Sequence, residues 1–191
     1  ENMTLRGMDF GQSGGGPRAA LHNLPVNSDI LSASSHNNGK TWSVGQLTTA
    51  VAVAESEPSL AIDPNNLSIY SYHSGTAWLT AKNSRPGTEG WKKSTINATS
   101  AEEIVGPAAL AAYKDGRYYA AWTQKTAGSS IRSLLFSESN DYGRSWSADV
   151  MLTETDHHGK HASLGVDDDG NLYAVWYDQE DYKAFHDIAF S

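Results

Sequence analysis

Acidic and histidine side chains gather at three places in this sequence, each just before a short run of small and apolar residues. Carboxylates can accept hydrogen bonds or exchange protons, and imidazoles can exchange protons or bind metals near neutral pH. Groups of this kind, together with aromatic side chains, suit the binding of a carbohydrate. The candidate ligand-binding residues are Arg18, Glu55, Glu57, Glu102, Glu103, His157, His158, His161, Tyr177 and Asp178.

Two of these groups could do more specific chemistry. Glycoside hydrolysis needs two carboxyl groups that face each other across a cleft. Glu102 and Glu103 cannot be such a pair by themselves, because neighbouring residues of an extended chain point to opposite sides. The imidazoles between His157 and His161 could ligate a metal, but no helix or fixed strand spacing arranges them. We therefore favour a solvated loop there, and we predict no metal ion and no cofactor.

An internal repeat positions these segments. Trp42, Trp91 and Trp146 recur at intervals of about 50 residues, which is the size of one propeller blade. A second series of small and apolar runs has nearly the same spacing, and each run leads through a turn of Asp, Asn or Gly into an aromatic strand. We predict four strands in each unit and no helix. The predicted units are about 17–48, 58–96, 107–152 and 161–191.

The segments Ser34–Trp42 and Ser137–Trp146 both predict one kind of hairpin turn, with Asn or Asp before a Gly and a Trp at the start of the next strand. Both resemble the Asp-box, or BNR repeat, of sialidases and other β-propeller proteins. In that family the acidic residue, the hydroxyl and the Gly tie the turn together. The resemblance assigns this role to Ser34, Asn38, Gly39, Thr41, Trp42, Ser137, Asp141, Gly143, Ser145 and Trp146, with Asn38 in place of the acidic residue.

The resemblance implies an all-β fold, a β-propeller of four-stranded antiparallel blades with three to four blades in this chain. Residues 1–191 would form one domain, or part of a larger propeller, and residues 2–10 are a candidate closing strand. Antiparallel strands connected in sequence send the turns after the first and third strands of each unit to one end. The loops that carry the candidate ligand-binding residues then meet at the opposite end, near the axis.

Composition excludes several classes of function. The 14 basic residues are scattered and the net charge is -8, which argues against nucleic acid binding. No apolar run approaches the roughly 20 residues that span a bilayer, so we expect no membrane insertion. The absence of cysteine excludes disulfides and thiolate metal sites. Sequons at Asn2, Asn66 and Asn97, each expected at a chain end or surface turn, favour a secreted glycoprotein.

The sialidase resemblance would imply three arginines that grip a carboxylate, but only Arg18 is well placed for the predicted pocket. We therefore predict a secreted, non-catalytic propeller that binds a carbohydrate or glycoprotein. The alternative is a fragment of a sialidase-like exo-glycosidase whose remaining catalytic residues lie outside this chain. A third interpretation is an extracellular assembly subunit that associates with itself through open blade edges.

Overall fold

The computed structural model describes residues 28–48, 54–75, 78–83, 92–97, 103–125, 128–180 and 187–190 of the 191-residue chain. These residues form antiparallel sheets, with one short 3₁₀ turn at Lys114–Gly116. The strands are β1 (Leu31–Ser34), β2 (Ser43–Gln46), β3 (Glu55–Ile62), β4 (Ser68–Ser74), β5 (Trp78–Asn83), β6 (Lys92–Thr95), β7 (Glu103–Tyr113), β8 (Arg117–Lys125), β9 (Arg132–Ser139), β10 (Val150–Met151), β11 (His157–Val166), β12 (Leu172–Glu180) and β13 (Asp187–Phe190).

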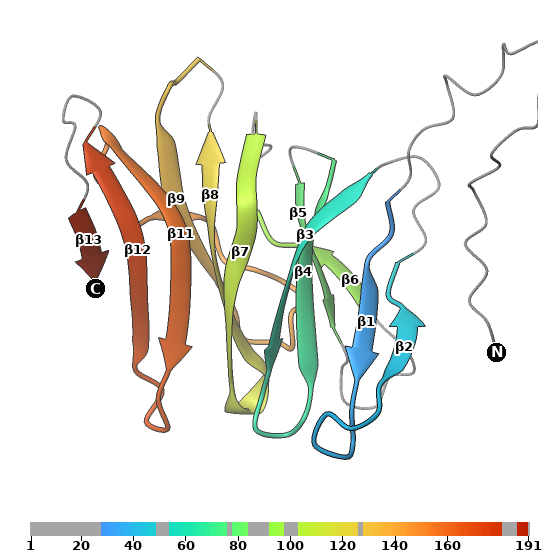
Figure 1. The fold of residues 1–191 in the computed structure, drawn as a ribbon. Helices are drawn as coiled ribbons and strands as arrows, with labels where there is room; N and C mark the ends of the chain where they lie inside the picture. Colours follow the sequence, from blue (N-terminus) through green and yellow to red (C-terminus); the bar gives the residue numbers. More distant parts are fainter. Residues whose placement is uncertain are drawn as a thin grey trace, which may run out of the picture.

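The sheets are the blades of a partial β-propeller. Two of them have four strands in sequence order, β3 to β6 and β7 to β10, and they are flanked by the β1–β2 pair and by β11 to β13. Figure 1 shows the first strands β3, β7 and β11 side by side, and β7 contacts both of the others. The predicted fold class of three to four antiparallel blades is confirmed. The proposed closing strand at residues 2–10 lies outside the described residues.

The first strand of each blade is longer than the sequence predicted. We expected these strands to begin at residues 58, 107 and 161, but β3 begins at Glu55, β7 at Glu103 and β11 at His157. The expected loop residues are therefore strand residues, because cross-strand hydrogen bonding continues past a bulge in each strand. This correction moves most of the candidate site from flexible loops to sheet backbone.

The core lies between neighbouring blades. The β3–β6 and β7–β10 sheets bury their facing side chains against each other, with Ile69 and Trp122 almost fully enclosed. A second interface joins the third blade to the fourth and contains Leu134 and Trp176. Burial of this apolar area at roughly 25 cal/mol per Å² is the main stabilising term. Trp122 and Trp176 thus serve inter-blade packing.

The turns after β3 and β11 share a local mechanism. The Asp63 carboxylate accepts the backbone N–H groups of Asn65 at 2.9 Å and Leu67 at 2.8 Å. Asp167 repeats this pattern and accepts the N–H of Asn171 at 2.8 Å. Such Asp side chains close a turn without help from the rest of the fold. The acidic 167–170 segment is therefore a turn, as its sequence predicted, and Figure 1 shows these turns at one end of the strands.

The turn at residues 139–146, between β9 and β10, is closed by the Asp141 carboxylate. Its oxygens accept the Ser145 hydroxyl at 2.6 Å and the N–H groups of Arg144 and Ser145 at 2.9 and 3.0 Å. The Ser139 hydroxyl donates to Asp141 at 2.8 Å and accepts the Gly143 N–H at 2.9 Å. The serine of this turn is therefore Ser139, whereas we expected Ser137. The Ser137 hydroxyl lies within β9 and donates to the Ser147 carbonyl at 3.0 Å.

The turn at residues 35–42, between β1 and β2, has the same pattern. The Ser35 hydroxyl donates to the Asn37 side-chain oxygen at 3.0 Å, and that oxygen accepts the Thr41 N–H at 2.9 Å. The acidic position is thus occupied by Asn37 rather than by Asn38, which instead takes the left-handed backbone with φ of 57°. Ser34, the serine that we expected here, is the last residue of β1. The assigned serine thus shifts by two residues in the 139–146 turn, and the serine and the acceptor each shift by one residue in the 35–42 turn.

The charge of Asp141 should make this turn sensitive to acid. Burial raises the pKa of Asp141, but hydrogen bonds from Ser145, Ser139 and Arg144 outweigh it and hold the pKa below the ordinary 3.8. Asp141→Asn should lower the free energy of unfolding by about 1 kcal/mol at neutral pH, because charge-assisted hydrogen bonds are the stronger ones. A pKa lowered by folding gives stability that is lost as pH falls through the folded value.

The measurement is urea unfolding of the wild type and of Asp141→Asn from neutral pH to below pH 3.8. The difference between the two proteins should shrink as the carboxyl protonates. Asn37→Ala in the 35–42 turn is the matched control, since it removes the equivalent acceptor without removing a charge. The prediction would be contradicted if the difference in the free energy of unfolding between the wild type and Asp141→Asn grew as the pH falls.

Two of the three sequons can be placed. Asn66 lies exposed in the turn between β3 and β4, with φ of 61°. Asn97 follows β6 and its exposed fraction is only 3%. The expectation of a surface turn is wrong for Asn97, because Ile96 directly before it packs into the core against the next blade and Asn97 is buried with it. Asn2 lies outside the described residues.

Candidate functional site

Three bulges occupy equivalent positions on the first strands, at the end opposite the turns. The pairing register shifts between Ser56 and Ser59 on β3, between Val105 and Ala109 on β7, and between Lys160 and Ser163 on β11. At each bulge one residue takes the left-handed backbone, and these are Glu57 with φ of 52°, Gly106 with φ of 70° and His161 with φ of 53°. The repeat therefore places one residue with left-handed backbone on the first strand of each of these three blades.

The left-handed backbone carries a cost at two of these positions. Gly106 adopts it freely, whereas a residue with a Cβ loses of order 1 kcal/mol. Glu57 and His161 keep this conformation because pairing with β4 and with β12 continues before and after each bulge. Strain of this kind is concentrated at functional sites. The bulges are thus one of the places, together with turns such as those that contain Asp115 and Tyr142, where residues other than Gly take the left-handed backbone.

A hollow of about 270 Å³ lies between the bulges of β7 and β11. We call it the bulge pocket, and it is lined by Val105, Gly106, Pro107, Lys160, His161 and Ala162. The Lys160 ammonium and the His161 imidazole can donate hydrogen bonds, while Pro107, Val105 and Ala162 offer apolar surface. A smaller hollow of about 220 Å³ on the other side of His161 is lined by Val175, Trp176 and Tyr177.

The structure brings only part of the predicted set to this region. His161 lines both hollows, Tyr177 lines the second, and Glu57 lies at the equivalent bulge on β3. Glu103 is exposed at the start of β7 and lines neither hollow. Arg18 and Glu102 lie outside the described residues. The predicted set lacked Lys160 and Gly106, although the repeat of Glu57-Pro58 as Gly106-Pro107 could have identified the second.

Glu55 and His158 belong to the interior, against our expectation of exposed ligand-binding groups. The Glu55 carboxylate accepts the Thr48 hydroxyl, and its exposed fraction is 7%. Burial and the nearby Glu55 raise the pKa of Tyr72 to about 12. His158 accepts the Arg132 backbone N–H at 3.1 Å through Nδ1. Strand alternation turns both side chains away from solvent. Each then forms a hydrogen bond to a neighbouring part of the chain, Glu55 to Thr48 and His158 to Arg132.

His73 is buried on β4, opposite Ser56 of β3. Burial lowers the pKa of His73, and the Glu57 carboxylate and the Gly106 carbonyl oppose that shift. Its Nε2 is buried and has no hydrogen-bond partner. His73 is therefore a neutral imidazole. It is buried next to Glu57 and Gly106, the left-handed residues of two of the three bulges.

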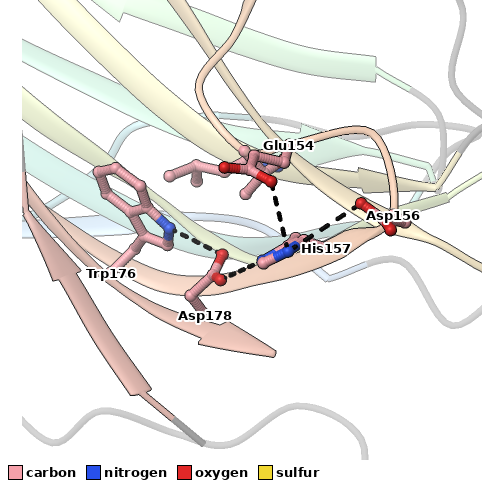
Figure 2. A network of polar contacts seen from close by, with 7 residues as sticks. Glu154, Asp156, His157, Trp176 and Asp178 are labelled. Atoms are coloured by element: carbon pink, nitrogen blue, oxygen red, sulfur yellow. Dashed lines mark hydrogen bonds and ion pairs between the residues drawn. The ribbon is translucent and has the colours of Figure 1, made fainter. Parts of the chain in front are cut away.

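A polar network lies at the start of β11 and the end of β12 (Figure 2). His157 Nδ1 and an Asp178 carboxylate oxygen form a hydrogen bond, and Trp176 Nε1 donates to the other oxygen at 3.3 Å. His157 Nε2 lies 3.6 Å from Glu154 Oε2 and 4.0 Å from Asp156 Oδ1. The hydrogen bond to Asp178 raises the pKa of His157, and Glu154 and Asp156 add to the effect. Two predicted residues, His157 and Asp178, thus meet here.

Solved structures that resemble this fold include an arabinanase and a sialidase. The chain is similar to an α-L-arabinanase of Penicillium chrysogenum complexed with arabinobiose, with a TM-score of 0.61 and 13% identity over 88% of this chain and 55% of that one. It is also similar to a mutant of the NanB sialidase of Streptococcus pneumoniae, with a TM-score of 0.50 and 19% identity over 76% of this chain and 23% of that one. No protein-family model and no curated protein sequence matches.

These similarities support the β-propeller fold. At 13% and 19% identity they carry no residue roles. This chain spans about half the length of the arabinanase and a quarter of the length of the sialidase. Among the described residues there is no helix of the length and apolar character that crosses a membrane.

Proposed function

We propose that this chain is part of a secreted β-propeller that binds a carbohydrate or the glycan of a glycoprotein at the bulge pocket. The observation that carries the proposal is the set of three equivalent bulges, two of them with strained, polar residues, beside a hollow with both polar and apolar lining. We take the 35–42 and 139–146 turns as Asp-boxes, which hold the opposite end of the blades and leave this end for a ligand.

The lining of the pocket suits a sugar. Sugar hydroxyls need hydrogen-bond donors and acceptors, which Lys160, His161 and the exposed backbone at Gly106 supply. The C–H faces of a sugar ring need apolar contact, which Val105 and Pro107 offer. The solved structures support a sugar as the ligand, since one is an arabinanase complexed with arabinobiose and the other is a sialidase.

The second candidate is part of a sialidase-like exo-glycosidase, and it is favoured by the fact that both similar structures are glycosidases. In that case the acid and base carboxylates would include Glu57, with partners on blades outside this chain. Of the arginines that the structure describes, Arg117 and Arg144 lie at the turn end of the blades. Release of arabinose or sialic acid by the full-length gene product would favour this candidate over a binding role.

The binding proposal is tested on a glycan array with the labelled wild type and the variants Glu57→Gln, Lys160→Ala and His161→Ala. Loss of contacts in the pocket should weaken binding by Lys160→Ala and His161→Ala about tenfold or more, which corresponds to about 1.4 kcal/mol. Glu57→Gln, at the equivalent bulge on β3, tests whether the ligand also reaches that blade. Lys40→Ala is the control, since Lys40 is exposed in the 35–42 turn at the other end of the strands. Binding retained by all three variants and lost in the control would place the ligand at the turn end.

A further inference from the structure

We propose that His157 Nε2 and the carboxylates of Glu154 and Asp156 bind a divalent transition-metal ion such as Zn²⁺. Their ligand atoms all lie within 4.8 Å of one another. This site would be separate from the sugar contacts of the bulge pocket, and Figure 2 shows the three side chains converging beside the ends of β11 and β12.

The His157 ring is oriented from behind by Asp178. A carboxylate only accepts hydrogen bonds, so the proton of this bond lies on His157 Nδ1. Asp178 is itself held by Trp176 Nε1, which is 3.3 Å from its second oxygen. The Nε2 lone pair of the neutral imidazole then points toward Glu154 and Asp156. A carboxylate behind a histidine is the usual support of a metal-binding imidazole, because it sets the tautomer and raises the basicity of the ring.

Among the described residues, the front of the ring faces two acceptors. Glu154 Oε2 and Asp156 Oδ1 lie 3.6 and 4.0 Å from Nε2, which is longer than a hydrogen bond. Two carboxylates beside the ring nitrogen are stabilised by a positive charge between them, which either a proton on Nε2 or a metal ion supplies. Ligand atoms on one Zn²⁺, each about 2.0–2.2 Å from the ion, lie about 3–4 Å apart. The two separations from Nε2 therefore fit a shared ion.

The backbone supports this arrangement. The His157 N–H donates to the Glu154 carbonyl at 3.2 Å, so a tight turn keeps both side chains together. The side chains of Glu154 and Asp156 are 83% and 63% exposed, which leaves room for water on the ion. Mixed imidazole and carboxylate ligands favour Zn²⁺ or Mn²⁺ over Mg²⁺ and Ca²⁺, which prefer oxygen ligands alone.

The test is calorimetric titration of the full chain with ZnCl₂, and separately with MgCl₂, at about pH 8, because the pKa of His157 is raised above the ordinary 6.5 and the ion needs the neutral ring. We expect one Zn²⁺ per chain, with weaker binding of Mg²⁺. His157→Gln and Glu154→Gln should each reduce Zn²⁺ affinity at least tenfold, while His36→Gln at the turn end should not. No saturable Zn²⁺ binding, or equal binding by His157→Gln, would overturn the proposal.

Asp178→Asn tests the positioning role separately. The amide keeps the size of the side chain but lacks the charge, and loss of such support costs about 10–100-fold in metal affinity. We expect weaker Zn²⁺ binding together with a changed tautomer ratio of His157 in ¹⁵N NMR, while the melting temperature without metal stays close to that of the wild type. An unchanged tautomer ratio and unchanged Zn²⁺ affinity would show that Asp178 does not orient the ring.

Discussion

Trp146→Ala is expected to lower the free energy of unfolding by about 2–3 kcal/mol, whereas Trp42→Ala should cost less than about 0.5 kcal/mol. The two residues occupy the same position in similar turns. Trp146 packs on the core between the second and third blades, and its Nε1 donates to the Ser94 hydroxyl at 3.2 Å. Trp42 is 61% exposed, and its Nε1 donates to the Gly39 carbonyl of its own turn.

The physical reason is the neighbouring blade. Ser94 on β6 also donates to the Gly143 carbonyl at 2.6 Å, so one hydroxyl links the 139–146 turn to the second blade. Urea unfolding of both variants measures the difference. Trp146→Phe keeps the ring but loses the N–H, and should cost about 1 kcal/mol. Equal losses for Trp42→Ala and Trp146→Ala would show that the tryptophan acts within its own turn and not between blades.

Gly116→Ala is expected to destabilise the protein by about 2–4 kcal/mol. Gly116 has φ of 77°, and a Cβ there would lie 2.6 Å from the Tyr142 ring. Its carbonyl accepts the Tyr142 N–H at 2.9 Å, which holds the ring in place and ties the 114–116 turn to the 139–146 turn. The left-handed backbone accounts for about 1 kcal/mol of the loss, and the steric overlap for about 1–3 kcal/mol.

Gly128→Ala is the matched control for this prediction. Gly128 has φ of 78°, but a Cβ there meets nothing within 4 Å, so the variant carries the backbone cost alone. The difference between the two variants in thermal or urea unfolding therefore measures the overlap. Gly116→Ala combined with Tyr142→Ala should recover part of the loss. If Gly116→Ala is no worse than Gly128→Ala, the two turns do not pack as described.

Acid sensitivity, the proposed sugar binding and the proposed metal binding concern three different parts of the molecule. The Asp141 experiment concerns the turn end, the glycan array concerns the bulge pocket, and the Zn²⁺ titration concerns the 154–157 segment. A failure of the binding proposal at the bulge pocket would leave the metal proposal intact, since His157 is hydrogen-bonded to Asp178 whereas His161 lines the pocket.

The sequence by itself determined the features that depend on contacts within a few residues. An Asp, Asn or Ser side chain reaches backbone N–H groups two to four residues away, so Asp141 and Asp167 close their turns through local hydrogen bonds. Repetition of those turns with alternating strands then predicts antiparallel blades, and that prediction is confirmed. Local chemistry did not distinguish Ser137 from Ser139, because both are serines just before the same turn.

Only the tertiary structure decided which polar residues are available to a ligand. Glu55 and His158 resemble site residues in the sequence, but each is buried and hydrogen-bonded to a residue outside its own strand, Thr48 and Arg132 respectively. Glu57 and His161 lie at bulges that no residue preference predicts, since a left-handed backbone is unfavourable for both. The cause is pairing between strands that are distant in the sequence. This pairing compensates for the strained backbone, and the packing of neighbouring strands determines which face of each strand is buried.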